Sequence, residues 1–372
     1  MKQKVVCVFG TRPEAIKMAP VVEELRKHSE NFETFVCVSA QHRQMLDQVL
    51  SLFEIKPDFD LNLMQTRQTL FYTTAKVLNG VKPVLKKLTP DWVLVQGDTT
   101  TTFAAALTAY YLRIPVAHIE AGLRTQDRYR PFPEEMNRKL TTNLATLHFA
   151  PTKQSQENLL REGVPEKDIY VTGNTVIDAL FLLLPKARSE IVNIRRLKKV
   201  DWSKRIILVT GHRRESFGQG FRQICQALKI LVKTNKDIEI IYPVHLNPNV
   251  IKPVYSILAG TPRVHLIKPL DYLPFIWLMD KSYLVLTDSG GIQEEAPSLG
   301  KPVLVMREVT ERPEGIEAGT VRLVGANTPR IIKEVNLLLH NKKEYERMAK
   351  AVNPYGDGHA ALRIVKVLQE QV

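Results

Sequence analysis

Short apolar runs alternate with helix-like segments along the whole chain. The runs typical of buried strands cover residues 5–9, 35–38, 92–95, 115–119, 169–171, 205–210, 238–242, 264–266, 283–286 and 302–305. The first helix is predicted to begin at Pro13, where a missing N–H costs nothing, and Pro20 is predicted to kink or shorten it. Strands that alternate with helices in this way form parallel sheets with helices on both faces.

The alternation pauses once and then restarts, which predicts two domains of the α/β class. The pause covers residues 186–204, which are rich in Lys and Arg and have no strand pattern. We therefore predict a Rossmann-like, doubly wound parallel-sheet domain over 1–185, a linker over 186–204 and a second such domain over 205–355. A helical segment over 356–372 follows and can pack back on the N-terminal domain. Two such sheets face a cleft at the carboxyl ends of their strands, where ligands bind.

The composition is ordinary for a soluble enzyme, with 44% hydrophobic and 24% charged residues among 372. The first apolar run stops at Gly10, which is too short for a signal sequence or a membrane span. Three cysteines, Cys7, Cys37 and Cys225, lie far apart without the paired spacing of a disulfide framework. We therefore expect a cytoplasmic protein.

The net charge of +13 is concentrated in the second half of the chain. Residues 1–185 carry 22 Lys or Arg against 20 Asp or Glu, whereas residues 186–372 carry 30 against 19. A basic second half suits a diphosphate-bearing ligand or a nucleic acid, and it is equally consistent with a Lys-rich surface. The basic residues are not interleaved with aromatic residues as in single-strand binding proteins.

Five polar clusters each follow a strand-like run. The first, residues 10–14 with Lys17, is a glycine turn into a helix N-terminus, which can hold an anion with backbone N–H groups. The alternative is a tight turn with Arg12 at the surface. The second, residues 96–102, places Asp98 at the end of a strand, where it either takes part in chemistry or caps the next helix.

The third cluster, residues 118–138, combines carboxylates and arginines directly after an apolar run. Carboxylates at the end of a buried strand can act as acids or bases, and arginines beside them can hold a phosphate. Glu120 is a strong candidate, because a carboxylate at the end of so apolar a strand needs a partner. For Glu135 and Arg138 we favour a surface ion pair between residues three apart on a helix.

The fourth cluster, residues 210–216, places His212 in the first βα turn of the second domain, where a histidine can titrate near neutrality. The alternative is a loop histidine among solvated arginines. The fifth cluster, residues 287–295, has paired glycines after a strand, so that backbone N–H groups can approach phosphate oxygens. Glu295 could accept ribose hydroxyl bonds, and Arg312 could supply charge to a diphosphate.

Two other kinds of chemistry are disfavoured. The nine histidines show neither an HExxH motif nor a Cys/His ligand spacing, which argues against a metal site. No GxSxG elbow is present and no cysteine lies in a polar turn, which argues against a nucleophilic serine or cysteine.

In this order, the clusters resemble the bacterial non-hydrolysing UDP-N-acetylglucosamine 2-epimerases almost end to end. The segments that carry the resemblance are 9–20, 96–99, 118–125, 131–138, 173–175, 210–216 and 288–297. The resemblance implies two Rossmann-like domains as in GT-B glycosyltransferases. It also implies interconversion of UDP-GlcNAc and UDP-ManNAc without metal or nicotinamide cofactor, for surface polysaccharide or teichoic-acid linkage synthesis. Members of this family are thought to eliminate UDP, leaving 2-acetamidoglucal, and to add it back with the proton on the other face.

The resemblance also implies roles for individual residues. The positions that match catalytic residues of the family are Asp98, Glu120, Glu134 and His212. Those that match UDP-binding residues are Arg12, Lys17, Ser289, Gly290, Gly291, Glu295 and Arg312, with Phe275 at the uracil pocket. Leu270 stands where some relatives have Gln, so a side-chain contact of that kind is not expected there.

Bacterial members of the family resemble one another in a second, activating site for UDP-GlcNAc. The matching positions are Gln41, Gln44, Arg67, Arg213, Glu215 and His245. They favour the allosteric, non-hydrolysing branch, in which substrate at this site keeps the intermediate from water. A homodimer is also expected from the family.

Four alternatives remain open from the sequence. A hydrolysing 2-epimerase would release free ManNAc and UDP. A GT-B glycosyltransferase would share the fold and the glycine-rich turn but would need an acceptor. A nucleotide-sugar sensor would bind UDP-GlcNAc without exchanging the hydrogen at C2. Nucleic-acid binding rests on the net charge alone and is not expected, and neither is membrane binding.

Overall fold

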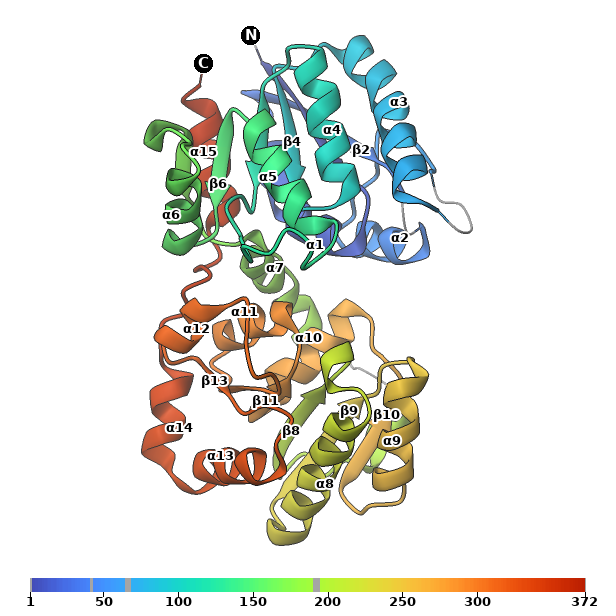
Figure 1. Cartoon of the computed structure of the whole chain (residues 1–372), viewed down its shortest axis with the longest axis vertical. Helices are drawn as coiled ribbons and strands as arrows, with labels where there is room; N and C mark the ends of the chain where they lie inside the picture. Colours follow the sequence, from blue (N-terminus) through green and yellow to red (C-terminus); the bar gives the residue numbers. More distant parts are fainter. Residues whose placement is uncertain (1, 41–42, 64–67, 190–194, 372) are drawn as a thin grey trace. The chain divides into compact units, whose positions relative to one another are not determined.

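The computed structural model describes residues 2–40, 43–63, 68–189 and 195–371, and it divides into two compact units. Unit 1 comprises Met1–Leu182 and Tyr355–Val372, and unit 2 comprises Leu183–Pro354 (Figure 1). The domain boundaries predicted from the sequence lie after residues 185, 204 and 355. Part of the predicted linker is helical, because helix α7 (Thr175–Ser189) extends into it and a 3₁₀ turn follows at Arg195–Lys199. Among the described residues, no helix is both long and apolar enough to cross a membrane.

Unit 1 contains a seven-stranded parallel sheet in the order β3-β2-β1-β4-β5-β6-β7. Its strands are β1 (Gln3–Phe9), β2 (Phe32–Val38), β3 (Phe59–Asp60), β4 (Trp92–Gln96), β5 (Val116–Ile119), β6 (Leu147–Ala150) and β7 (Ile169–Val171). Its helices are α1 (Arg12–Lys27), α2 (Arg43–Leu52), α3 (Leu70–Leu88), α4 (Thr100–Tyr111), α5 (Glu134–Leu144), α6 (Lys153–Arg161), the first part of α7 and α15 (Ala360–Gln369), with a 3₁₀ turn at Glu166–Asp168.

Helices cover both faces of this sheet, which is the doubly wound arrangement that was predicted. On one face, Val6 and Val8 of β1 pack in a core cluster with buried residues of α3 and α4. Alternate residues of a strand point to opposite faces, and the intervening residues of β1 are buried too. The helix α1 contacts β1 as well as α2 and α15. α1 continues through Pro20 to Lys27, so the prediction that this proline shortens the helix is wrong.

Unit 2 contains a six-stranded parallel sheet in the order β10-β9-β8-β11-β12-β13. Its strands are β8 (Arg205–Thr210), β9 (Ile238–Pro243), β10 (Val264–Ile267), β11 (Leu284–Thr287), β12 (Val303–Val305) and β13 (Val321–Leu323). Its helices are α8 (Gln219–Thr234), α9 (Pro248–Leu258), α10 (Tyr272–Lys281), α11 (Gly290–Ser298), α12 (Pro313–Glu317), α13 (Thr328–His340) and α14 (Lys342–Ala349), with a 3₁₀ turn at Arg214–Ser216.

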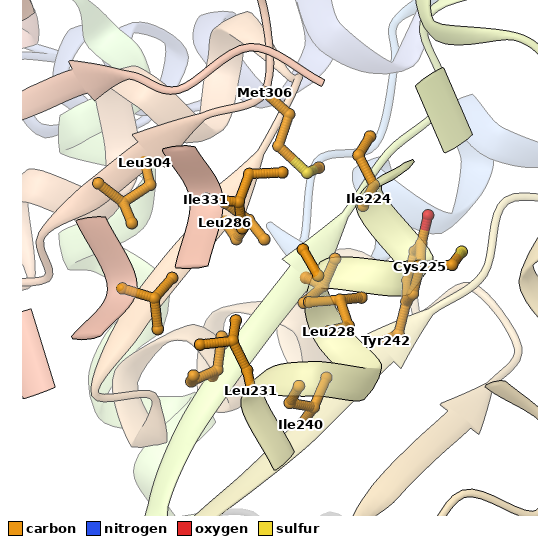
Figure 2. Packing of buried hydrophobic residues seen from close by; sticks show 14 of the residues in the cluster. Ile224, Cys225, Leu228, Leu231, Ile240, Tyr242, Leu286, Leu304, Met306 and Ile331 are labelled. Atoms are coloured by element: carbon orange, nitrogen blue, oxygen red, sulfur yellow. The ribbon is translucent and has the colours of Figure 1, made fainter. Parts of the chain in front are cut away.

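The core of unit 2 forms where α8 and α13 pack together over the sheet. Leu228 and Leu231 of α8 lie with Ile240 and Tyr242 of β9 in one buried cluster, which Ile331 of α13 joins (Figure 2). Burial of these side chains supplies most of the driving force for folding. A sheet anchored in this way holds its strand ends, and therefore the turns that follow them, in fixed positions.

Candidate active site

The polar clusters of unit 1 gather at the carboxyl edge of its sheet. β1, β4 and β5 are neighbours and parallel, so the turns that follow them leave the sheet at the same edge. Asp98 and Glu120 lie in the turns after β4 and β5, Asn174 lies in the turn after β7, and Glu14 lies in the first turn of α1, which follows β1. The sheet thus brings together residues that are up to 160 positions apart in the sequence.

Glu120 is held by donors from three other segments. Its backbone has a φ of +64°, in the left-handed region, and its side chain is 8% exposed. Lys17 of α1 forms an ion pair with Oε1, and Gln96 at the end of β4 donates from Nε2 to Oε2. Asn174 donates from Nδ2 to Oε1 over 3.0 Å. The predicted partner of the Glu120 carboxylate is thus a cluster of donors. One of these donors is Lys17, which the sequence predicts as a UDP-binding residue.

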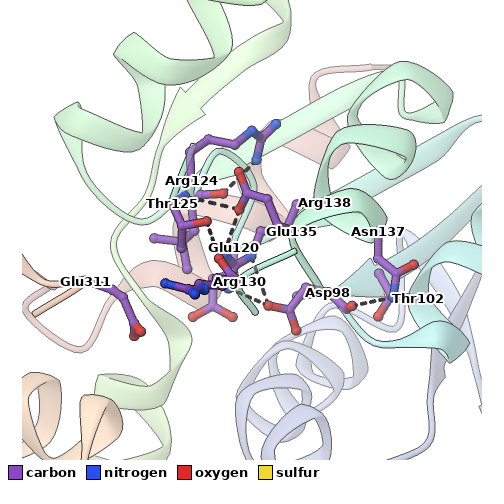
Figure 3. Close-up of polar contacts among 12 residues, drawn as sticks. Asp98, Thr102, Glu120, Arg124, Thr125, Arg130, Glu135, Asn137, Arg138 and Glu311 are labelled. Atoms are coloured by element: carbon purple, nitrogen blue, oxygen red, sulfur yellow. Dashed lines mark hydrogen bonds and ion pairs between the residues drawn. The ribbon is translucent and has the colours of Figure 1, made fainter. Parts of the chain in front are cut away.

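Asp98 is oriented by helix α5. Arg138 donates from Nε to Oδ2 over 2.9 Å and its Nη2 lies 2.7 Å from the same oxygen, while Asn137 donates to the Asp98 carbonyl (Figure 3). Arg138 also donates to Glu135 over 3.1 Å. Glu134 is the first residue of α5 and is half-buried.

The prediction of a surface pair between Glu135 and Arg138 is wrong. The carboxylate of Glu135 is completely buried and accepts hydrogen bonds from the backbone N–H groups of Thr125 and Gln126. The loop between β5 and α5 thus binds this carboxylate through its backbone. Both residues therefore form part of the support for Asp98, and the sequence pattern of α5 gave no sign of it.

Two buried residues fix the turns at this edge. Burial lowers the pKa of His118 to about 3, so the ring is neutral and its Nε2 donates to the Gly97 carbonyl over 2.7 Å. Burial raises the pKa of Glu14, although hydrogen bonds from Thr99, Thr102 and the backbone N–H of Gly10 oppose that rise. Glu14 thereby ties the turn after β1 to the turn after β4. Arg12, at the start of α1, is half-buried.

The turns at the carboxyl edge of the unit 2 sheet contain a histidine–carboxylate pair. Oδ2 of the buried Asp288 accepts hydrogen bonds from the backbone N–H groups of His212 and Arg213, at 2.7 and 2.8 Å. Nδ1 of His212 lies 3.1 Å from Oδ1 of Asp288. Burial alone would raise the pKa of Asp288, but the contacts with His212 and the two N–H groups outweigh it and hold that pKa below its usual value. The imidazole is 39% exposed and therefore accessible.

Two arginines lie beside the first turn of α11, which follows the N-cap residue Ser289. A Cβ placed on Gly290 would lie 3.7 Å from Nη2 of Arg312 and 4.0 Å from Nη2 of Arg213. A helix N-terminus carries partial positive charge, and two guanidinium groups beside it strengthen its attraction for an anion. Arg312 forms an ion pair with the buried Glu294, which fixes its direction.

The remaining predicted residues of unit 2 lie on α10 and α11. Glu295 accepts a hydrogen bond from the Tyr272 hydroxyl over 3.2 Å, and a Cβ placed on Gly291 would lie 3.6 Å from its Oε1. Phe275 lies one turn after Tyr272 on α10 and is half-buried. In the part of the chain that the structure describes, no three His, Cys, Asp or Glu side chains are grouped in a way that could hold a metal ion.

Comparison with known proteins identifies the family. The model of the UDP-N-acetylglucosamine 2-epimerase family matches residues 23–369. The UDP-N-acetylglucosamine 2-epimerase of Salmonella typhimurium is 59% identical over 370 residues, covering 98% of each chain. The chain belongs to the UDP-N-acetylglucosamine 2-epimerase family.

Solved structures of proteins in this family agree with the fold. A protein from Listeria monocytogenes matches with a TM-score of 0.94 and 50% identity, over 100% of this chain and 97% of that one. The UDP-GlcNAc 2-epimerase of Neisseria meningitidis, solved with UDP-GlcNAc bound, matches with a TM-score of 0.89 and 52% identity, over 99% of this chain and 100% of that one. The prediction of two Rossmann-like, GT-B-like α/β domains is therefore confirmed.

The residues that match the activating site of the epimerase family are spread over both units. Gln41 and Arg67 lie outside the described residues. Gln44 is exposed on α2. In unit 2, the His245 ring stacks on the His212 ring with centroids 5.6 Å apart, and Glu215 forms a 2.6 Å ion pair with Arg307. The activating second site stays a prediction.

Proposed function

We propose that this chain interconverts UDP-GlcNAc and UDP-ManNAc without net hydrolysis. The observation that carries the proposal is the pair of differently held carboxylates in unit 1. Glu120 is nearly buried among uncharged and cationic donors, whereas Asp98 is 27% exposed and held by one guanidinium. Two carboxylates that are held by different donors at one edge of the sheet can serve as the acid and the base of a proton transfer.

The reaction needs both a proton transfer and a leaving group. A base removes the proton from C2, the C1–O bond to UDP breaks, and the electrons form the C1=C2 double bond of 2-acetamidoglucal. Re-addition of UDP at C1, with a proton delivered to the other face of C2, gives the epimer. Asp98, Glu120 and Glu134 are the proposed acids and bases, and His212, oriented by Asp288, is the proposed fourth catalytic residue.

UDP must be retained while the double bond exists. The first turn of α11, with Arg213 and Arg312 beside it, supports binding of the diphosphate. Glu295 is proposed to accept bonds from ribose hydroxyls, and Phe275 is proposed to contact the uracil. The epimerase of Neisseria meningitidis, at 52% identity, was solved with UDP-GlcNAc bound, which supports the same ligand here.

The test is NMR of the purified protein with UDP-GlcNAc in D2O, without added metal or cofactor. The expected result is UDP-ManNAc with deuterium at C2 in both nucleotide sugars, because the proton lost in elimination is replaced from solvent. Free ManNAc together with UDP would contradict the proposal and assign the chain to the hydrolysing branch. An unchanged spectrum would favour a transferase or a sensor.

A further inference from the structure

Asn174 contacts three separate segments of unit 1 and is 3% exposed. Its side-chain Nδ2 donates to Oε1 of Glu120 over 3.0 Å. Its backbone N–H donates to the carbonyl of Tyr355 over 2.7 Å. Its Oδ1 accepts from the backbone N–H of Val176 over 3.1 Å, at the start of α7. Because Nδ2 donates to Glu120 and Oδ1 accepts from Val176, the side-chain amide has one orientation that satisfies both bonds.

The segment that Asn174 contacts through its backbone is the one by which the chain returns to unit 1. The chain leaves this unit after Leu182 and re-enters it at Tyr355, which is buried. Gly173 has a φ of +92°, and a Cβ placed on it would lie 3.3 Å from Cα of Gly356. The two backbones thus touch directly, and side chains at either glycine would separate them. The returning segment therefore fixes the position of the Asn174 backbone.

Groups from α1, β4, β5 and the turn before α7 lie around the Glu120 carboxylate. Lys17 of α1 supplies a positive charge, while Gln96 of β4 and Asn174 supply uncharged N–H donors. His118 of β5 is nearby and neutral. Lys17 attracts the carboxylate whatever its rotation, whereas an amide N–H donates along a defined direction. The orientation of the carboxylate thus depends on both amides, Gln96 at Oε2 and Asn174 at Oε1, and Asn174 is the one that is tied to the returning segment.

We propose that Asn174 is a positioning residue for the epimerisation. Its amide holds the Glu120 carboxylate in the orientation that the reaction uses, and the returning segment at Tyr355 holds that amide in place. The inference rests on the proposed function, because it requires Glu120 to act on the substrate.

The decisive variant is Asn174→Asp. It keeps the size of the side chain, the acceptor for Val176 and the backbone N–H, but it replaces the donor to Glu120 by a second carboxylate. Two adjacent carboxylates cannot readily both ionise, so as the pH falls the pair takes up one proton, which restores a hydrogen bond between the two side chains. We expect kcat to fall by about 10- to 100-fold at about pH 8, and the loss to shrink toward about pH 5.5. KM should change much less than kcat.

Two further variants make the result specific. Asn174→Ala loses the donor permanently, so its deficit should persist at low pH. Asn143→Asp makes the same charge change on the exposed side of α5. Within the described residues, the Asn143 amide donates to the Lys139 carbonyl. This variant should leave activity unchanged. Thermal melting of each variant, followed by circular dichroism, checks that it is folded.

The outcomes separate the inference from the proposed function. A loss of kcat in Asn174→Asp that recovers as the pH falls, with Glu120→Gln inactive, supports both. An inactive Glu120→Gln with a fully active Asn174→Asp would overturn the inference alone. A loss in Asn174→Asp that is equal at every pH and accompanied by a lower melting temperature would also overturn it, because that pattern indicates a purely structural role. A fully active Glu120→Gln would refute the role of Glu120 itself.

Discussion

At the scale of single residues, the guanidinium of Arg138 contacts two carboxylates that differ in exposure. Asp98 is 27% exposed, whereas the side chain of Glu135 is completely buried. A guanidinium presents several N–H donors in a rigid plane, so it can orient both partners at once, which an ammonium group cannot do. The buried partner anchors the arginine, and the arginine in turn orients Asp98.

Replacing Arg138 by Lys tests this arrangement. The positive charge is kept, but the planar set of N–H donors is lost, so the Asp98 carboxylate should no longer be held in one direction. We expect kcat to fall by about tenfold or more, which corresponds to at least about 1.4 kcal/mol. The measurement is the rate of C2 deuterium exchange into UDP-GlcNAc, with circular dichroism to confirm folding. Arg161→Lys is the matched control, because the contact of Arg161 within the described residues is an exposed i,i+4 pair with Glu157, which should tolerate the change. Equal rates for both variants would show that the planar guanidinium of Arg138 is not needed.

The candidate residues differ in how far the sequence could predict their surroundings. Glu120 could be predicted to need a partner, because it follows an apolar strand. The burial of Glu135 could not be predicted, because the groups that cover and bind it belong to the loop at Thr125 and Gln126, not to its own helix. The contact of Asn174 with Glu120 depends on which strands are neighbours in the sheet, and periodicity along the chain carries no such information.

At the scale of elements, the turn after β5 is held against α6. Gly122 has a φ of +90°, and a Cβ placed on it would lie 2.2 Å from the backbone oxygen of Ser155. Asn158 of the same helix donates to the Gly122 carbonyl over 3.0 Å. Glu120 lies two residues before this contact, so the fit of the turn on α6 determines where the carboxylate leaves the sheet.

Gly122→Ala and Gly163→Ala form a matched pair that separates backbone strain from collision. Both glycines have a left-handed φ, but a Cβ on Gly163 would meet nothing within 4 Å. Gly163→Ala should lower the free energy of unfolding by about 1–2 kcal/mol, the cost of the conformation alone. Gly122→Ala should cost clearly more and should also lower activity, because a backbone atom cannot move aside easily. Urea unfolding curves measure the difference, and equal losses of stability in the two variants would contradict it.

The sequence pattern missed three strands, β3, β6 and β13. Ten strands could be recognised because each contains several consecutive apolar residues with turn signals around them. β3 has two residues, which is too few for any pattern, and β13 has an arginine between Val321 and Leu323, so it contains no run of consecutive apolar residues. β6 contains a histidine, His148, which is buried and pairs in register with His118 of β5. Its strand character therefore depends on burial within the sheet rather than on the residue types alone.

At the scale of the whole molecule, unit 1 is discontinuous in sequence. Its sheet is built from the first part of the chain, and α15 at the end of the chain packs against α1 of that unit. Asp178 of α7 accepts a hydrogen bond from the backbone N–H of Ala361 over 2.8 Å and so caps α15, whose N-cap residue His359 makes no side-chain cap hydrogen bond. The stability of unit 1 therefore depends on residues that follow unit 2 in the chain.

This organisation predicts opposite effects for two equivalent core substitutions. Ile364 of α15 and Ile331 of α13 are both fully buried in helices, and replacing either by Ala should cost about 2–5 kcal/mol. In hydrogen exchange followed by mass spectrometry, Ile364→Ala should raise exchange in peptides of β1 and α1, which begin the chain, and leave β8 and β9 protected. Ile331→Ala should do the reverse. If Ile364→Ala instead raised exchange in β8 and β9, α15 would stabilise unit 2. Cooperative unfolding would then follow neighbourhood in the sequence rather than the contacts of the folded chain.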